Sequence, residues 1–92
     1  METGLSIIIP SLNPGSFIGR CLGAIDRELE CVDRPYEILV VDSSPHPLEL
    51  PQIPNQTLYQ SKVQLFASEA RNMGARLAKY PLLVFLDNVR CN

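Results

Sequence analysis

The sequence has 92 residues and a formal net charge of -2 at pH 7, with 46% hydrophobic and 20% charged residues. These values fit one small globular domain with a packed core and exclude an intrinsically disordered chain. The lysines and arginines are scattered. Because no basic stripe is present to follow a phosphate backbone, we expect no nucleic-acid partner.

The cysteines and the apolar segments indicate the compartment. Cys21, Cys31 and Cys91 are widely spaced and form no CxxC pair, which suggests neither a disulfide framework nor a zinc site. No apolar segment approaches the length of a bilayer span, and the first residues lack the basic flank of a secretory signal. We therefore expect a cytoplasmic chain without a membrane span.

The first predicted strand is the β-branched run 6–10, which we expect to end at Pro10 because proline cannot donate to a sheet ladder. Turn-forming residues follow at 13–16, and Ser16 is placed to cap a helix. The next apolar residues recur at helical spacing and predict one face packed on a sheet. They are Ile18, Cys21, Leu22, Ile25 and Leu29.

The second predicted strand covers residues 36–41, is apolar on both faces, and has Asp42 at its carboxyl end. Residues 43–56 contain four prolines and no periodicity, which predicts a long loop. A short third strand is predicted over 57–60, where Thr57 and Tyr59 favour extended structure.

A second helix is predicted to begin with Ser68 as its cap and to run through Lys79. Its small residues, including Gly74, would let it lie close to the sheet. The last predicted strand covers 82–86 and is followed by Asp87.

This alternation of strands and helices predicts the α/β class, with a mainly parallel sheet flanked by helices in a Rossmann-like arrangement. We expect the second and last strands to lie on either side of the first strand or near it. Polar residues follow the strands where such a sheet forms its binding crevice.

Four segments occur in an order that resembles the nucleotide-binding half of a family 2 glycosyltransferase, which has the GT-A fold. They are SIIIPSLN at 6–13, EILVVD at 37–42, ARNMG at 70–74 and LLVFLD at 82–87. The resemblance extends from Leu5 to Asn88, about the first half of such a catalytic domain. It implies a single partial domain over 1–92, with the acceptor half absent, that binds a nucleotide sugar, with a UDP-sugar as the leading donor.

The resemblance assigns nucleotide-sugar contacts to Ser11, Asn13, Asp42 and Arg71. Asp42 would accept hydrogen bonds from the base or ribose, but from the residues alone it can equally cap the following turn. Arg71, expected in the first turn of the second helix, would contact the diphosphate. The alternative for this arginine is an ordinary solvated or ion-paired side chain, with Glu69 as a local partner.

The family usually ends its last strand of this half with a DxD-type cluster that holds a divalent cation. This sequence has Asp87 as a ligand candidate for Mn²⁺ or Mg²⁺, but Val89 stands where the second carboxylate is expected. Either metal binding is lost, or a one-residue deletion has disturbed the motif. The family's second acidic position after Asp42 is also changed, to Ser43.

No catalytic residue is assigned, because the family's catalytic base belongs to the acceptor half. In a longer parent protein, the segment would serve inverting transfer of a sugar to an acceptor, while the 92-residue chain alone is expected to be inactive. One alternative is a non-catalytic nucleotide-binding or interaction module. Another is a gene remnant whose exposed apolar strand edge leads to self-association.

Overall fold

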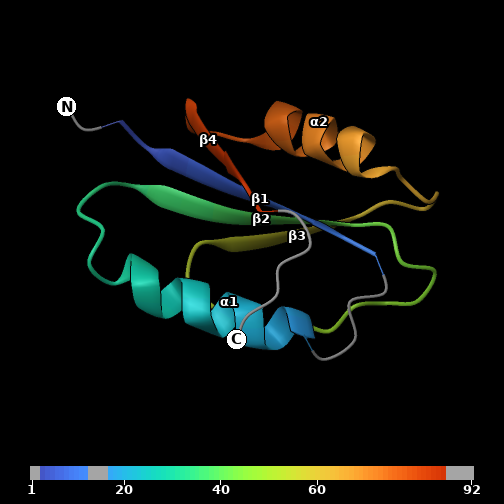
Figure 1. Cartoon of the computed structure of the whole chain (residues 1–92), viewed down its shortest axis with the longest axis horizontal. Helices are drawn as coiled ribbons and strands as arrows, with labels where there is room; N and C mark the ends of the chain where they lie inside the picture. The colour runs from blue at the N-terminus through green and yellow to red at the C-terminus, as the bar shows by residue number, and fades with distance from the viewer. Residues whose placement is uncertain (1–2, 13–16, 87–92) are drawn as a thin grey trace.

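The computed structural model of the chain describes residues 3–12 and 17–86. The elements follow in the order β1 (Leu5–Ser11), α1 (Phe17–Leu29), β2 (Tyr36–Asp42), β3 (Gln56–Gln60), α2 (Ala67–Leu77) and β4 (Leu82–Phe85). All strand pairs are parallel, and the sheet order is β3-β2-β1-β4. With α1 on one face of the sheet and α2 on the other (Figure 1), the predicted Rossmann-like α/β arrangement is confirmed.

Strand β1 runs through Pro10 to Ser11, so the predicted end at Pro10 is wrong. The backbone N–H of Leu86 donates to Ile8 O, so even-numbered residues of β1 direct their backbone groups toward β4. Pro10 therefore faces the β4 side, where β4 has already ended opposite Ile8. A missing N–H breaks no ladder bond at that position, and the strand continues along β2.

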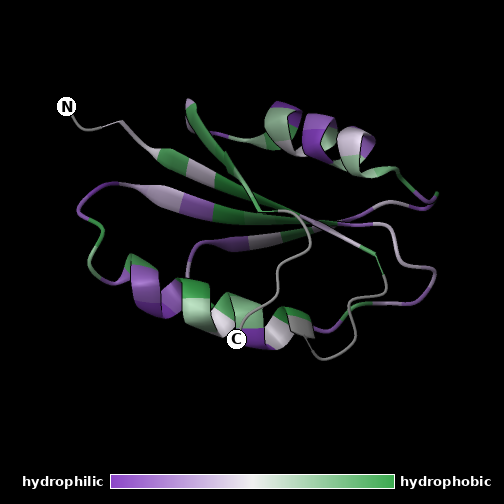
Figure 2. Ribbon diagram, in the orientation of Figure 1, coloured by the Kyte–Doolittle hydropathy of each residue, from purple (hydrophilic) through white to green (hydrophobic). Residues whose placement is uncertain are grey.

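The larger apolar core lies between the sheet and α1. Its buried members come from alternate positions of β1 and β2 and from one face of α1. They are Ile7, Ile9, Ile18, Leu22, Leu29, Ile38 and Val40. Figure 2 shows hydrophobic colouring along both strands and on parts of α1. The predicted apolar face of α1 is confirmed, and Ser16, its predicted cap, lies outside the described residues.

The core on the α2 side is smaller and depends on close packing. Ile8, Leu39 and Val41 are buried against Ala70. Gly74, one turn after Ala70, lies so close to Ile8 that a Cβ atom added to the glycine would overlap the isoleucine side chain. The backbone of α2 therefore rests on β1 at this point, as the small residues of the sequence predicted.

Helix α2 begins at Ala67 and ends at Leu77, with Phe66 as its N-cap residue. The predicted Ser68 cap is therefore wrong. The side chain that caps the helix start is that of Glu69, within the first turn. Its Oε1 accepts a hydrogen bond of 2.9 Å from the Phe66 backbone N–H. This is the carboxylate half of a capping box, which satisfies one N–H at the helix start.

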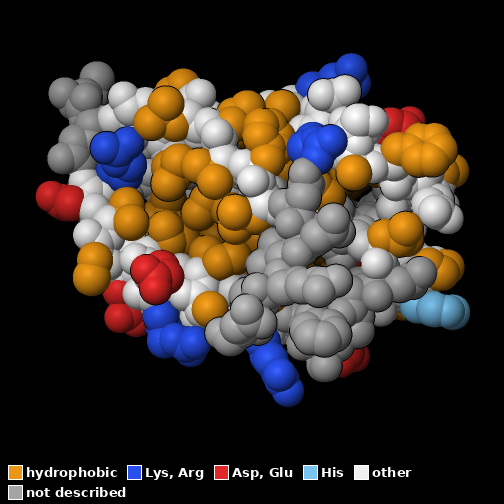
Figure 3. All heavy atoms as spheres, in the orientation of Figure 1, with side chains coloured by type: hydrophobic (Ala, Val, Ile, Leu, Met, Phe, Trp, Pro, Cys, Tyr) orange, Lys and Arg blue, Asp and Glu red, His pale blue; other side chains and the backbone are white. Residues whose placement is uncertain are grey.

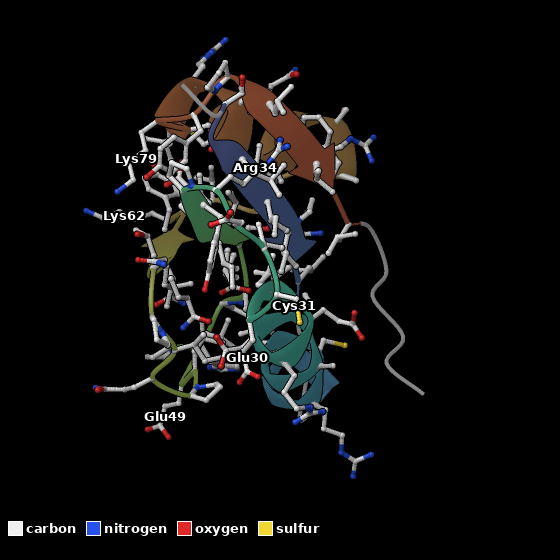
Figure 4. All side chains as sticks on the ribbon, turned by 90° about the vertical axis from the view of Figure 1, so that its left-hand side faces the viewer. Glu30, Cys31, Arg34, Glu49, Lys62 and Lys79 are labelled. Atoms are coloured by element: carbon white, nitrogen blue, oxygen red, sulfur yellow. The ribbon has the colours of Figure 1, made fainter. Side chains whose placement is uncertain are left out.

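A buried polar cluster holds the return of the chain from α2 to the sheet. The Glu37 carboxylate accepts hydrogen bonds from the Ser6 hydroxyl (2.6 Å) and from the Lys79 backbone N–H (2.7 Å). The Ser6 hydroxyl in turn accepts one of 3.2 Å from the Tyr80 backbone N–H. Figure 4 shows the Lys79 side chain extending outward from this position. The cluster fixes the start of β4 beside β1.

The cysteines depart from the expectation of a chain without disulfides. Cys21 is buried in α1 and is disulfide-bonded, whereas Cys31, just after α1, is free and exposed (Figure 4). Spacing along a sequence does not report distance in space, so the pattern gave no sign of this bond. Among the described helices, neither has the length and apolar character needed to cross a membrane.

Candidate functional site

The candidate site lies at the carboxyl ends of β1 and β2. The two strands end in register, with Ser11 opposite Asp42. One residue later, the Ser43 backbone N–H donates a hydrogen bond of 3.0 Å to Ser11 O. This bond extends the pairing past the last strand residues and brings the side chains that follow both strands to the same edge.

A pocket of about 400 Å³ opens at this edge, between the strand ends and the start of α2. Its walls combine apolar side chains with two serine side chains and one arginine. The lining residues are Pro10, Ser11, Leu12, Ser43, Leu65, Ala67, Ala70 and Arg71. Two sequence-predicted residues, Ser11 and Arg71, are thus brought together although they are far apart in the chain.

Ser11 carries the most informative polar group of the pocket. The residue is 8% exposed, and its buried hydroxyl has no hydrogen-bond partner among the described residues. Leaving a buried hydroxyl unpaired costs about 1–3 kcal/mol. Because the hydroxyl oxygen is itself buried, a ligand atom in the pocket would pair with it only after the Ser11 side chain turns toward the pocket, and that pairing would recover this free energy.

Arg71 reaches the pocket because of how α2 packs. Ala70 and Gly74 form the buried face of the helix against β1 and β2. Arg71 follows Ala70 directly, so it lies beside this face, at the pocket wall. Arg71 is the fifth residue of α2. The prediction that it lies in the first turn is therefore wrong. Ala67 brings the amino end of the helix, where the first N–H groups of an α-helix have no acceptor in the helical ladder, to the same wall.

Asp42 is placed differently from the expectation for a nucleoside contact. Its side chain is fully buried and is absent from the pocket lining described above. The carboxylate accepts hydrogen bonds from the Ser44 hydroxyl (2.7 Å), the Ser44 N–H (3.2 Å) and Gln60 Nε2 (3.0 Å). The turn-capping interpretation describes this geometry, since Asp42 stabilises the turn after β2 and ties it to β3.

Sequence analysis missed the part played by Ser43 and Gln60. Ser43 was considered only as the place of a missing carboxylate, yet it is buried and lines the pocket. Gln60 lies opposite Asp42 in the β2–β3 register. A short polar strand gives no register signal, so the chain order alone could not reveal that pair.

Two predicted site residues, Asn13 and Asp87, lie outside the described residues. Within residues 3–12 and 17–86, no group of three or more His, Cys, Asp or Glu side chains could hold a metal ion. The predicted Mn²⁺ or Mg²⁺ site at Asp87 therefore remains a prediction.

A parallel sheet with a pocket at the carboxyl ends of adjacent central strands is the arrangement in which open α/β proteins bind their ligands. The fold and the pocket together define a Rossmann-like protein with a ligand-sized cavity at this edge of the sheet.

Comparison with known proteins adds a relation to glycosyltransferases. The chain is 30% identical over 90 residues to validoxylamine A glucosyltransferase from Streptomyces hygroscopicus subsp. jinggangensis (strain 5008), which covers 90% of this chain and 21% of the relative. The enzyme of the same name from Streptomyces hygroscopicus subsp. limoneus matches with 30% identity over 90 residues and 20% of its length. The chain thus spans about a fifth of these relatives. No family model and no solved structure matches it.

Proposed function

We propose that this chain is the donor-binding segment of a family 2 glycosyltransferase and that its pocket takes the nucleoside diphosphate part of a UDP-sugar. The observation that carries the proposal is that Arg71 and Ser11, whose hydroxyl has no partner among the described residues, line the same pocket at the carboxyl end of the parallel sheet. The relation to glucosyltransferases over nearly the whole chain supports it.

The chemistry of the pocket suits a diphosphate. An arginine offers a planar set of N–H donors that match phosphate oxygens. The amino end of α2, at Ala67, adds backbone N–H groups and the positive end of the helix dipole. The Ser11 and Ser43 hydroxyls can donate to further oxygens, and Leu12 and Leu65 offer apolar surface to a ribose or base.

In a full-length enzyme, the acceptor hydroxyl would attack the anomeric carbon of the bound sugar. The bond from that carbon to the diphosphate oxygen would break, the acceptor proton would pass to a carboxylate base, and the nucleoside diphosphate would leave with its negative charge. In this scheme, Arg71 stabilises the departing diphosphate. No base is assigned within this chain, so the chain alone is expected to bind without transferring sugar.

The test is calorimetric titration of the chain with UDP, with and without Mn²⁺. We expect saturable binding that weakens by roughly tenfold or more in Arg71→Ala, because a charged hydrogen-bonding partner of the diphosphate is lost. Arg76→Ala is the matched control, since Arg76 is exposed in the last turn of the same helix. Equal affinities of the two variants, or no binding by the folded chain, would reject the assignment.

Ser11→Ala separates the ligand contact from structure. Removing an unpaired buried hydroxyl should leave the stability of the free chain unchanged or slightly raised. It should nevertheless weaken UDP binding several-fold. Mn²⁺ dependence of the same titration would support the predicted metal site at Asp87, and identical curves with and without Mn²⁺ would oppose it.

The alternative function is a non-catalytic nucleotide-binding module. The hydroxyl of Ser43 in the pocket, at a position where the resembled family has a carboxylate, favours it. Both functions predict UDP binding. They separate when the flanking genomic sequence is read, because a downstream acceptor half with an acidic base supports the transferase.

A further inference from the structure

The pocket carries polar groups on two different walls. One wall belongs to α2 and the residue Leu65 before it, and it holds Arg71 and the helix start at Ala67. The other wall, here called the strand-end wall, consists of the residues that end or follow β1 and β2, and its polar members are Ser11 and Ser43. Because the proposed function places the diphosphate at Arg71, the strand-end wall is the candidate for contact with the nucleobase.

Ser43 is held in place by hydrogen bonds on both sides. Its own backbone N–H donates a bond of 3.0 Å to Ser11 O. The next residue, Ser44, donates its backbone N–H (3.2 Å) and its hydroxyl (2.7 Å) to the Asp42 carboxylate. The backbone that carries the Ser43 side chain is therefore fixed before a ligand arrives, and little ordering is needed when the ligand binds.

The carboxylate of Asp42, next to Ser43, is engaged elsewhere. Asp42 is fully buried and is absent from the pocket lining. Besides the two bonds from Ser44, it accepts one of 3.0 Å from Gln60 Nε2. Turning the carboxylate toward a nucleobase would break these bonds and leave their donors without an acceptor. Asp42 therefore acts as a positioning residue for the turn that carries Ser43.

We propose that the Ser43 hydroxyl contacts the nucleobase and that the pocket consequently takes the nucleoside diphosphates of both uracil and cytosine. The proposal rests on the proposed function, since it uses the same pocket and the same place for the diphosphate. An ionised carboxylate only accepts hydrogen bonds, so at this position it would pair with the uracil N3–H and repel the lone pair of cytosine N3. A hydroxyl both donates and accepts, so it pairs with either base.

The apolar part of the pocket does not separate the two bases. Pro10 and Leu12 of the strand-end wall and Leu65 of the other wall offer apolar surface. Figure 3 shows hydrophobic side chains at the right-hand end of the molecule, where β1 and β2 end and α2 begins in Figure 1. Uracil and cytosine are rings of nearly the same size, so contact with this surface favours them about equally. Selectivity between them then depends on the hydrogen bond at Ser43.

The test is calorimetric titration of the chain with UDP and with CDP in the same buffer. The two dissociation constants should agree within about threefold. Ser43→Ala should weaken both by a similar factor of several-fold, because each base loses one hydrogen bond. Ser43→Asp should bind UDP at least about tenfold more tightly than CDP. The ratio is the readout, since the added negative charge also weakens binding of either diphosphate.

Ser68→Asp is the matched control for this charge. Ser68 is exposed in the first turn of α2 and lies outside the pocket lining, so both dissociation constants should change by the same factor. The proposal is overturned if the unchanged chain binds UDP more than about tenfold more tightly than CDP, or if Ser43→Ala binds both as well as the unchanged chain does. Either result leaves the proposed function intact. Failure of the folded chain to bind either nucleotide would reject the proposed function and this proposal together.

Discussion

The two helical layers cover the same sheet by different means. On the α1 side, large side chains such as Leu22 and Ile18 fill the space between helix and strands. On the α2 side, Ala70 and Gly74 let the helix backbone approach β1 directly. The difference matters for the site, because the close approach of α2 carries Arg71 to the pocket wall. The α1 layer contributes most of the buried apolar side chains of the core, whereas the α2 layer places Arg71 at the pocket.

The largest expected effect comes from the α1 layer. Leu22 is fully buried, so Leu22→Ala should lower the free energy of unfolding by about 3–5 kcal/mol through lost burial and the cavity left behind. The measurement is urea unfolding followed by circular dichroism. Leu77→Ala, at a position 44% exposed on α2, is the control and should cost less than about 1 kcal/mol. Similar losses at both positions would contradict the difference between the layers.

The next effect concerns the polar cluster on the α2 side of the sheet. Glu37→Ala removes the acceptor of the buried Ser6 hydroxyl and of the Lys79 N–H, whose hydrogen bond is partly buried. We expect a loss of about 2–4 kcal/mol in unfolding free energy. Glu30→Ala, at an exposed glutamate after α1 (Figure 4), should leave the unfolding midpoint almost unchanged. A Glu37 variant as stable as the Glu30 variant would show that the cluster contributes little.

A methyl group tests the close approach of α2 itself. Gly74→Ala places a Cβ atom against Ile8, which should cost about 1–3 kcal/mol through overpacking. Because relief of the overlap moves α2 away from β1, UDP binding at Arg71 should also weaken. The two readouts are thermal unfolding and calorimetric titration of the folded variant. Unchanged stability together with unchanged UDP binding would show that α2 and β1 can accommodate the added methyl group without strain.

The smallest effect is a gain of stability on the opposite layer. A Cβ atom at Gly23 in α1 would meet nothing closer than Arg27 Nη1 at 3.9 Å. Gly23→Ala should therefore stabilise the chain by about 0.5–1 kcal/mol through helix propensity and the entropy of the unfolded state. An unfolding temperature of Gly23→Ala below that of the unchanged chain would contradict the open space found at Gly23 in the structure.

The strands and the first helix could be predicted because their burial leaves a strong pattern. The run 38–41 is apolar on both faces, and a central parallel strand, covered on both faces, accommodates it. The start of α2 was misassigned because the cap came from Glu69 within the helix rather than from a serine before it. The continuation of β1 past Pro10 depends on the length of β4, which no property of residues 6–10 reveals.

The site was predictable only in part. Ser11 and Arg71 were identified through the resemblance, and both line the pocket. Their neighbour Ser43 was missed because a carboxylate was sought at that position. The environment of Asp42 depends on Gln60, and their pairing follows from the register of a five-residue polar strand. Such a register is set by tertiary contacts rather than by local sequence.

The cluster around Glu37 also allows local opening of the chain to be measured by amide hydrogen exchange. The amide protons of Lys79 and Tyr80 are held by acceptors from β2 and β1, although the Lys79 side chain lies at the surface. In deuterated water these two amides should exchange much more slowly than their exposed neighbours, at a rate set by how often the segment 79–80 opens from the sheet. Any partner that binds along β4 would therefore slow their exchange further without touching either residue.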